Sequence, residues 1–235
     1  KNEIKMNPKT FRFSFDIIKQ IYRVGLPAMA MQLLASVMLA GANLIIARHS
    51  ITAVAVFGVF FRLQSFIFMP VFGLGQGVIP LTGYNYGNRN PRRMKQTARI
   101  GIITAFCFTF TGFIVFQSFP RQLITMFNSN PELVEIGVTA MRRISIGFLF
   151  IGPSIMSSVI FQAIGRGIPS LLLGILRTII VLLPSMYILG ELFGLRGLWF
   201  AFPLAEVTTF SLGITWLYKV LKEIFRSMEA AAESS

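Results

Sequence analysis

The chain has 235 residues, of which 54% are hydrophobic and only 13% are charged, and its mean hydropathy is +0.68. Its 24 phenylalanines are more than one soluble core of this size can bury, so the composition indicates an integral membrane protein. The net charge of +13 does not indicate a nucleic-acid partner, because most basic residues sit in short stretches between apolar segments instead of alternating with aromatic residues on one face.

Six apolar segments are long enough to cross the bilayer as helices, which takes about 20 residues each. We place them at residues 25–47, 53–80, 102–119, 136–163, 169–189 and 198–217. Strands of a membrane barrel would be about ten residues long with alternating polarity, which these segments are not. The predicted fold is therefore all-α, a polytopic membrane protein of six transmembrane helices.

A basic segment precedes the first span. Phe11, Phe15, Ile18 and Tyr22 follow helical spacing and form one apolar stripe. This pattern predicts either an amphipathic helix lying on the membrane surface or an extension of the first span that bends out of the membrane.

Lysine and arginine are distributed very unevenly between alternate loops. One side of the membrane would hold fifteen of them and the other only Arg48, Arg121 and Arg196. Because positive residues stay in the cytoplasm, both termini are predicted to be cytoplasmic in a multi-pass protein of the plasma or inner membrane. The fifteen are Lys1, Lys5, Lys9, Arg12, Lys19, Arg23, Arg89, Arg92, Arg93, Lys95, Arg99, Arg166, Lys219, Lys222 and Arg226.

Several short motifs occur at the ends of these spans. The second span contains Pro70 and Pro80 among several glycines, and it ends in Gly-Tyr-Asn-Tyr-Gly-Asn at residues 83–88, followed by a basic run. Gly-Leu-Pro at 25–27 opens the first span, Phe-Gln-Ala-Ile-Gly-Arg at 161–166 closes the fourth, and Gly-Leu-Trp-Phe-Ala-Phe-Pro at 197–203 opens the sixth. In this order the motifs resemble those of the multidrug and toxic compound extrusion (MATE) family.

Members of that family have twelve spans arranged as two six-helix lobes. The resemblance implies that this chain is the C-terminal lobe, with the N-terminal lobe of the same transporter as its partner. Residues 1–24 would then form the cytoplasmic connector, residues 25–220 the six-helix lobe and residues 221–235 a cytoplasmic tail. Two units with an even number of spans keep the same orientation when joined in tandem, which is consistent with this arrangement.

Ionisable residues inside the predicted spans are candidates for function, because they are costly in lipid. Arg62 lies about 16 Å along the second span and faces either the cleft between lobes or a partner within this lobe. Arg177 and Glu206 lie about 12 Å from opposite membrane surfaces, so their side chains can meet. They form either a structural ion pair or an ion-coupling site at which Glu206 exchanges a proton.

Uncharged polar residues in the spans are the candidate lining of a substrate cavity. We select Gln32, Asn43 and Ser154 for this role together with Arg62. For the glutamines and asparagine, hydrogen bonds between helices are the alternative role, as they are for Gln64 and Gln162.

Glu206 is the only acid deep in any predicted span. Some members of the family carry acids in the first and fourth spans of this lobe, where this chain does not, so the resemblance gives little support for a Na⁺ site in this half. We therefore expect the main coupling carboxylate to lie in the N-terminal lobe. With one histidine, one cysteine, no nucleotide-binding glycine loop and no metal-spaced cluster, the sequence predicts no enzyme, cofactor or metal site.

Taken with the resemblance, these features predict half of an H⁺- or Na⁺-coupled antiporter that exports drug-like organic compounds by alternating access. One alternative is a flippase of the same superfamily for lipid-linked saccharides, which four arginines within the spans, Arg62, Arg142, Arg143 and Arg177, would suit. Another is a complete six-helix membrane scaffold or channel, which a native reading frame of about this length would favour.

Overall fold

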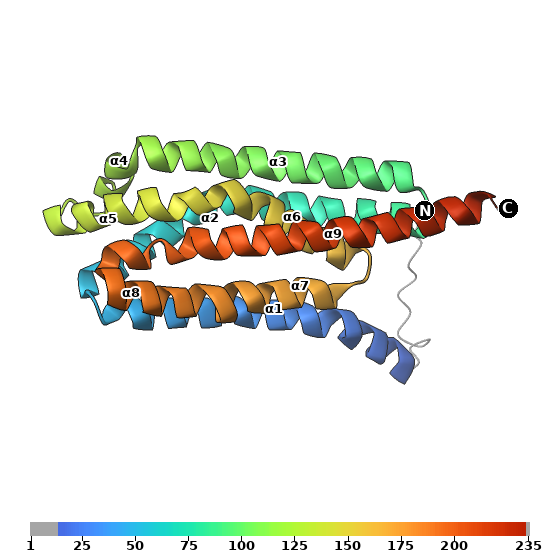
Figure 1. Ribbon diagram of the computed structural model, residues 1–235, viewed down its shortest axis with the longest axis horizontal. Helices are drawn as coiled ribbons and strands as arrows, with labels where there is room; N and C mark the ends of the chain where they lie inside the picture. The colour runs from blue at the N-terminus through green and yellow to red at the C-terminus, as the bar shows by residue number, and fades with distance from the viewer. Residues whose placement is uncertain (1–13, 234–235) are drawn as a thin grey trace, which may run out of the picture.

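The structure, a computed structural model, describes residues 14–233 as a bundle of long helices that run side by side (Figure 1). No strand occurs among these residues. The start of α1 and the end of α9 lie at the same end of the bundle, here called the terminal end (Figure 1). In chain order the elements are α1 (Phe15–Ala47), α2 (Ile51–Gly87), α3 (Pro91–Ser118), α4 (Pro120–Thr125), α5 (Pro131–Ile144), η2 (Ser145–Gly147), α6 (Phe148–Ala163), α7 (Gly167–Ile175), η3 (Leu176–Leu182), α8 (Leu183–Leu198) and α9 (Ala201–Glu233).

Within the described part, five helical stretches are long and apolar enough to cross a membrane. They are Met29–Ala47, Ile51–Gly87, Pro91–Ser118, Pro131–Ala163 and Gly167–Leu198. Most of the sixth predicted span, residues 198–217, lies in α9, which begins at Ala201, has 33 residues and packs in the bundle but is not among the five. Glu206 and several hydroxyl residues make α9 less apolar, so a sixth span stays a prediction based on its length and position.

The first helix continues into the basic segment. Residues 15–24 belong to α1, which runs unbroken to Ala47. This agrees with the alternative in which the first span extends beyond the membrane, whereas Phe11 and the rest of residues 1–13 lie outside the described residues. The division into connector, lobe and tail stays a prediction.

The second span is a continuous helix, as predicted, despite its prolines and glycines. The prolines at 70 and 80 lie inside α2, which remains one helix of 37 residues. Four basic residues that the sequence suggested for a loop belong instead to the start of α3, because the connection itself is only Asn88–Asn90. They are Arg92, Arg93, Lys95 and Arg99.

Two of the sequence motifs are helix C-terminal caps at the terminal end. After α2, the N–H of Asn90 donates to the carbonyl of Asn85 at 2.9 Å, with Arg89 between them at a φ of 49°. After α6, the N–H of Arg166 donates to the carbonyl of Phe161 at 2.9 Å around Gly165, whose φ is 74°. Both are Schellman motifs, which require a left-handed residue and usually use glycine there. The motifs therefore end helices.

The fourth and fifth spans are interrupted helices. A 3₁₀ turn, η2, separates α5 from α6, and the π-helix η3 separates α7 from α8. The positive φ of Gly194, 61°, adds a kink near the end of α8. Interruptions of this kind often mark functional positions, so they direct attention to the residues on η2 and η3.

The core consists of two apolar clusters stacked along the bundle. The cluster away from the terminal end is rich in aromatic residues, including Phe57, Phe60, Phe148 and Trp199. The second cluster joins α2, α3 and α6 to the last turns of α9. On α9 the first cluster stops at Ala205 and the second resumes at Leu217, so Glu206 lies where the two clusters separate.

Candidate functional site

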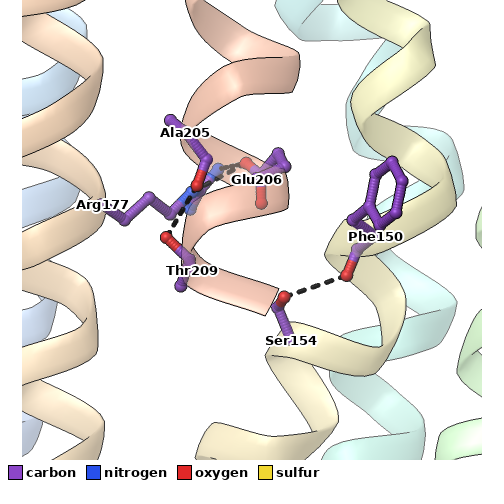
Figure 2. A network of polar contacts seen from close by, with 6 residues as sticks. All are labelled: Phe150, Ser154, Arg177, Ala205, Glu206 and Thr209. Atoms are coloured by element: carbon purple, nitrogen blue, oxygen red, sulfur yellow. Dashed lines mark hydrogen bonds and ion pairs between the residues drawn. The ribbon is translucent and has the colours of Figure 1, made fainter. Parts of the chain in front are cut away.

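Among the side chains that the structure describes, one ion pair is present, and it joins Arg177 on η3 to Glu206 on α9. The Nε of Arg177 donates to Oε1 of Glu206 at 2.7 Å, and one terminal guanidinium nitrogen contacts the same oxygen. The Glu206 side chain is 6% exposed and that of Arg177 is 31% exposed. Figure 2 shows Arg177 reaching across from its own helix to α9. A carboxylate this deeply buried needs such a partner, since an unpaired buried charge is very costly.

The second oxygen of Glu206, Oε2, is buried and has no hydrogen-bond partner among the described residues. Glu206 also lines a cavity of about 20 Å³, together with residues of α1, α2, α5, η2, α6 and η3. Most of these residues are apolar, and a cavity of this size has room for about one water molecule. The lining residues are Met38, Phe61, Gln64, Ile144, Gly147, Phe148, Ile151, Arg177, Phe202 and Glu206.

Local backbone structure places both members of the pair. Arg177 is the second residue of the π-helix Leu176–Leu182, whose wider turn changes where its side chain points compared with a regular α-helix. Gly147 on η2 allows α9 to come close, because a Cβ added there would lie 3.1 Å from Cγ of Glu206. The site therefore depends on two helix interruptions, one on each neighbouring span.

Hydrogen bonds near the pair stay within single helices. Thr209 donates through Oγ1 to the carbonyl of Ala205 at 2.8 Å, one turn earlier on α9. Ser154 donates through Oγ to the carbonyl of Phe150 at 2.9 Å, one turn earlier on α6 (Figure 2). Ser154 is thus not joined to Arg177 and Glu206 by a hydrogen bond, and its role in a substrate cavity stays a prediction.

The remaining predicted cavity residues lie on α1 and α2. Gln32 and Arg62 are exposed and Asn43 is half-buried. None of the three lines the cavity at Glu206. The structure therefore brings Arg177 and Glu206 together but leaves the other four predicted residues apart from them, and the functional roles of all six stay predictions.

Arg62 belongs to a continuous exposed stripe of α2. Gly58, Phe66, Met69, Gly73 and Gln76 repeat with helical spacing on the same side and are exposed as well. A Cβ added to Gly58 or Gly73 would meet no atom within 4 Å, so this side of α2 is open in the described part of the chain. Because Arg62 lies well inside a membrane-spanning helix, an open arginine there calls for a covering surface or water.

Some features of the site had no sequence signal. Gln64 belongs to the polar residues for which a cavity or a packing role is predicted, and Met38 to the methionines that could form an apolar binding wall or face lipid, but nothing in the sequence singles out Gly147. A glycine between two bulky apolar residues, as at 147, is compatible with close helix packing, which is a weak signal. Gln162 donates to Ser170 on α7 at 3.2 Å, as a hydrogen bond between helices, which was one of the two roles considered for it.

The fold and the motifs agree with one known family. Its model, MatE, matches residues 27–188, which is most of the chain. The chain belongs to the MatE family. This confirms the resemblance seen in the motifs, and proteins of the MATE family are transporters, not enzymes.

Curated relatives of this MATE chain include the multidrug export protein MepA of Staphylococcus haemolyticus. It is 28% identical over 228 residues, which cover 94% of the chain but 48% of MepA. MepA of Staphylococcus saprophyticus is 29% identical, over 86% of the chain and 45% of that protein. The MATE chain thus spans about half the length of the curated relatives it matches.

The chain also covers about half of the solved structures that it matches. An outward-facing multidrug resistance MATE transporter of the MOP superfamily matches with a TM-score of 0.87 and 26% identity, over 93% of this chain and 50% of that one. A MOP superfamily transporter from Pyrococcus furiosus, described as having a binding pocket of reverse polarity that suggests a different function, matches with a TM-score of 0.87 and 25% identity, over 94% and 50%. The all-α transmembrane fold is therefore confirmed, with coverage consistent with one lobe.

Proposed function

We propose that this chain is the C-terminal lobe of a multidrug transporter that exports drug-like organic compounds in exchange for H⁺ or Na⁺. The exposed stripe of α2 carries this proposal, because it contains Arg62 and Gln76 on a helix that crosses the membrane. A membrane arginine that faces out of its own bundle needs a second polar or protein surface. The half-length coverage of MepA supports an N-terminal lobe as that surface.

Transport would proceed by alternating access. The two lobes would rock against each other around a central cleft bounded by α1 and α2, while each lobe moves largely as a bundle. Exposed glycines along α2, such as Gly58 and Gly73, would let the partner lobe approach closely. Both termini would face the cytoplasm, as the distribution of basic residues favours.

Ion coupling would depend mainly on the N-terminal lobe. In this lobe Glu206 is already paired with Arg177, and no other acid lies deep in a predicted span. A buried carboxylate that pairs with an arginine would have to break that pair before it could bind a transported cation, which would leave a buried charge without its partner. Glu206 would therefore act first as a structural anchor between η3 and α9, and only secondarily as a proton carrier.

Reconstitution in vesicles tests this proposal directly. Vesicles with a pH or Na⁺ gradient would contain the full-length transporter, the two halves expressed together, or this chain alone, and the efflux of a cationic dye would be followed. We expect gradient-driven efflux in the first two cases and none in the third. Efflux by this chain alone, with the gradient collapsing in step, would show that the second lobe is not required.

A flippase for lipid-linked saccharides is the second candidate. The open stripe of α2 carries a cation and no acid, which suits an anionic pyrophosphate better than a cationic drug. The Pyrococcus furiosus neighbour, whose binding pocket of reverse polarity suggests a different function, is a precedent for a change of function within this fold. Competition between a lipid pyrophosphate and a cationic dye for the full-length protein separates the two, since only a drug transporter binds the dye more tightly.

A further inference from the structure

The arginines at the end of the bundle opposite the terminal end differ in whether their side chains have partners. Arg143 stacks over the ring of Phe200 at 4.8 Å and donates to the carbonyl of Arg196, and Arg48 lies over the ring of Tyr187 at 5.7 Å. For the side chains of Arg121 and Arg142, in contrast, the described residues provide no hydrogen bond, ion pair or stacked ring. These two guanidinium groups are available to a ligand.

Arg121 and Arg142 line the same groove. It lies between α4 and α5, has a volume of about 610 Å³ and is open to the outside. Its polar lining also includes Gln122, Glu135 and Thr139, and its apolar lining comes from prolines and valines on the two helices. The volume falls within the range of about 300–1,000 Å³ that is typical of small-molecule sites.

The two candidate spans beside the groove place it near one membrane surface. It is bounded by the end of one candidate span, Pro91–Ser118, and the start of the next, Pro131–Ala163. Beside it, the short helix α4 is flanked by exposed apolar residues, with Phe119 54%, Met126 79% and Phe127 43% exposed. Exposed apolar side chains such as these are suited to contact the acyl chains just below the headgroups.

The charges of the groove select among lipids. Two arginines and Glu135 give a formal net charge of +1, which one phosphodiester would neutralise. Arginine recognises phosphate with paired, charge-assisted hydrogen bonds. Glu135, Gln122 and Thr139 would accept from or donate to hydroxyl groups of the headgroup.

We propose that this groove binds the headgroup of an anionic glycerophospholipid of the phosphatidylglycerol type, with its phosphate between Arg121 and Arg142. The acyl chains would leave the groove past the exposed apolar residues at the ends of α4. This site is separate from the cleft on α1 and α2 and does not depend on which compound the transporter exports.

Native mass spectrometry of the detergent-purified full-length transporter tests the proposal. Phosphatidylglycerol, phosphatidylethanolamine and phosphatidylcholine would be titrated against the native protein and the double variant Arg121→Gln/Arg142→Gln. We expect the native protein to retain phosphatidylglycerol preferentially and the double variant to bind it about tenfold more weakly, since two charge-assisted contacts are lost. Arg196→Gln is the matched control: it removes an exposed arginine at the same end but outside the groove, and should leave retention unchanged.

Three further arms make the outcome decisive. Inorganic phosphate and glycerol 3-phosphate at millimolar concentration should not displace the lipid, and displacement would show a site for free phosphate esters instead. Glu135→Gln should bind phosphatidylglycerol at least as tightly as the native protein. If thermal melting shows that the glutamine double variant is unfolded, Arg121→Lys/Arg142→Lys replaces it and should keep at least a third of the retention. Equal retention in the folded glutamine double variant, no retention in the folded lysine variant, or no preference among the three lipids would overturn the proposal.

Discussion

Two arginines at membrane depth are treated differently by this chain. Arg177 is held inside the bundle by the buried carboxylate of Glu206, whereas Arg62 lies on an open stripe of α2 and forms no hydrogen bond, ion pair or stacked ring with the side chains that the structure describes. The bundle therefore supplies a counter-ion for Arg177, and it leaves Arg62 to be covered by a surface outside the bundle. Arg177 is therefore expected to govern stability, and Arg62 to govern transport.

Breaking the internal pair should have the largest effect. Glu206→Leu leaves the guanidinium of Arg177 without its counter-ion, and we expect the free energy of unfolding to fall by about 3 kcal/mol, the lower end for a broken buried pair because Arg177 is partly exposed. Unfolding of the full-length protein in detergent, followed by tryptophan fluorescence, measures this. The double variant Arg177→Leu/Glu206→Leu should recover most of the loss, and equal losses in the single and double variants would contradict a structural pair.

Crowding the same pair should have a smaller effect. Gly147→Ala places a Cβ 3.1 Å from Cγ of Glu206, so we expect a loss of about 1–2 kcal/mol from overpacking. Gly87→Ala, in the last turn of α2, is the control, because its added Cβ would meet nothing within 4 Å and alanine favours a helix by up to about 1 kcal/mol. Similar melting temperatures for the two variants would show that α9 does not approach η2 closely.

The open arginine should affect transport instead of stability. Arg62→Leu is expected to lower the rate of dye efflux by the full-length transporter about tenfold, equivalent to about 1.4 kcal/mol, with no loss in melting temperature. The readout is the initial efflux rate in vesicles at equal protein content. Arg62→Lys keeps the charge and should retain at least about half of the rate. A lower melting temperature with unchanged efflux would reverse the roles assigned to the two arginines.

Loss of an ordinary hydrogen bond between helices should have the smallest effect on stability. Gln162→Leu removes the contact with Ser170, and we expect a loss of about 0.6 kcal/mol, the average for such bonds in membranes. The same unfolding measurement detects it. A loss as large as that of Glu206→Leu would mean that neutral contacts, not the ion pair, hold these spans together.

Much of the bundle follows from the sequence because its signals are local. Apolar length fixes most spans, and the Gly-Tyr-Asn-Tyr-Gly-Asn and Phe-Gln-Ala-Ile-Gly-Arg motifs locate two turns because each contains the residues of a helix end. The depth of Arg177 and Glu206 along their helices was enough to predict that the side chains could meet, and they do.

The rest depends on geometry that leaves no local pattern. A π-helix needs one extra residue per turn but no particular composition, so the position of η3 was not foreseen. The value of Gly147 depends on α9 being its neighbour, and the cavity is lined by seven separate elements. The exposure of Arg62 likewise depends on which side of α2 the other helices cover. For α9, apolarity is a weaker indication of a membrane span than the position of the helix in the bundle.

The open stripe of α2 also has a consequence for biosynthesis. A helix that presents an arginine to lipid at its centre inserts at a cost of about 2.5–3.5 kcal/mol, so it gains from a neighbour that covers it during assembly. If this chain were made without that neighbour, Arg62 would remain a marker of incomplete assembly for membrane proteases. The lifetime of the protein in the cell would then be set by how quickly α2 is covered.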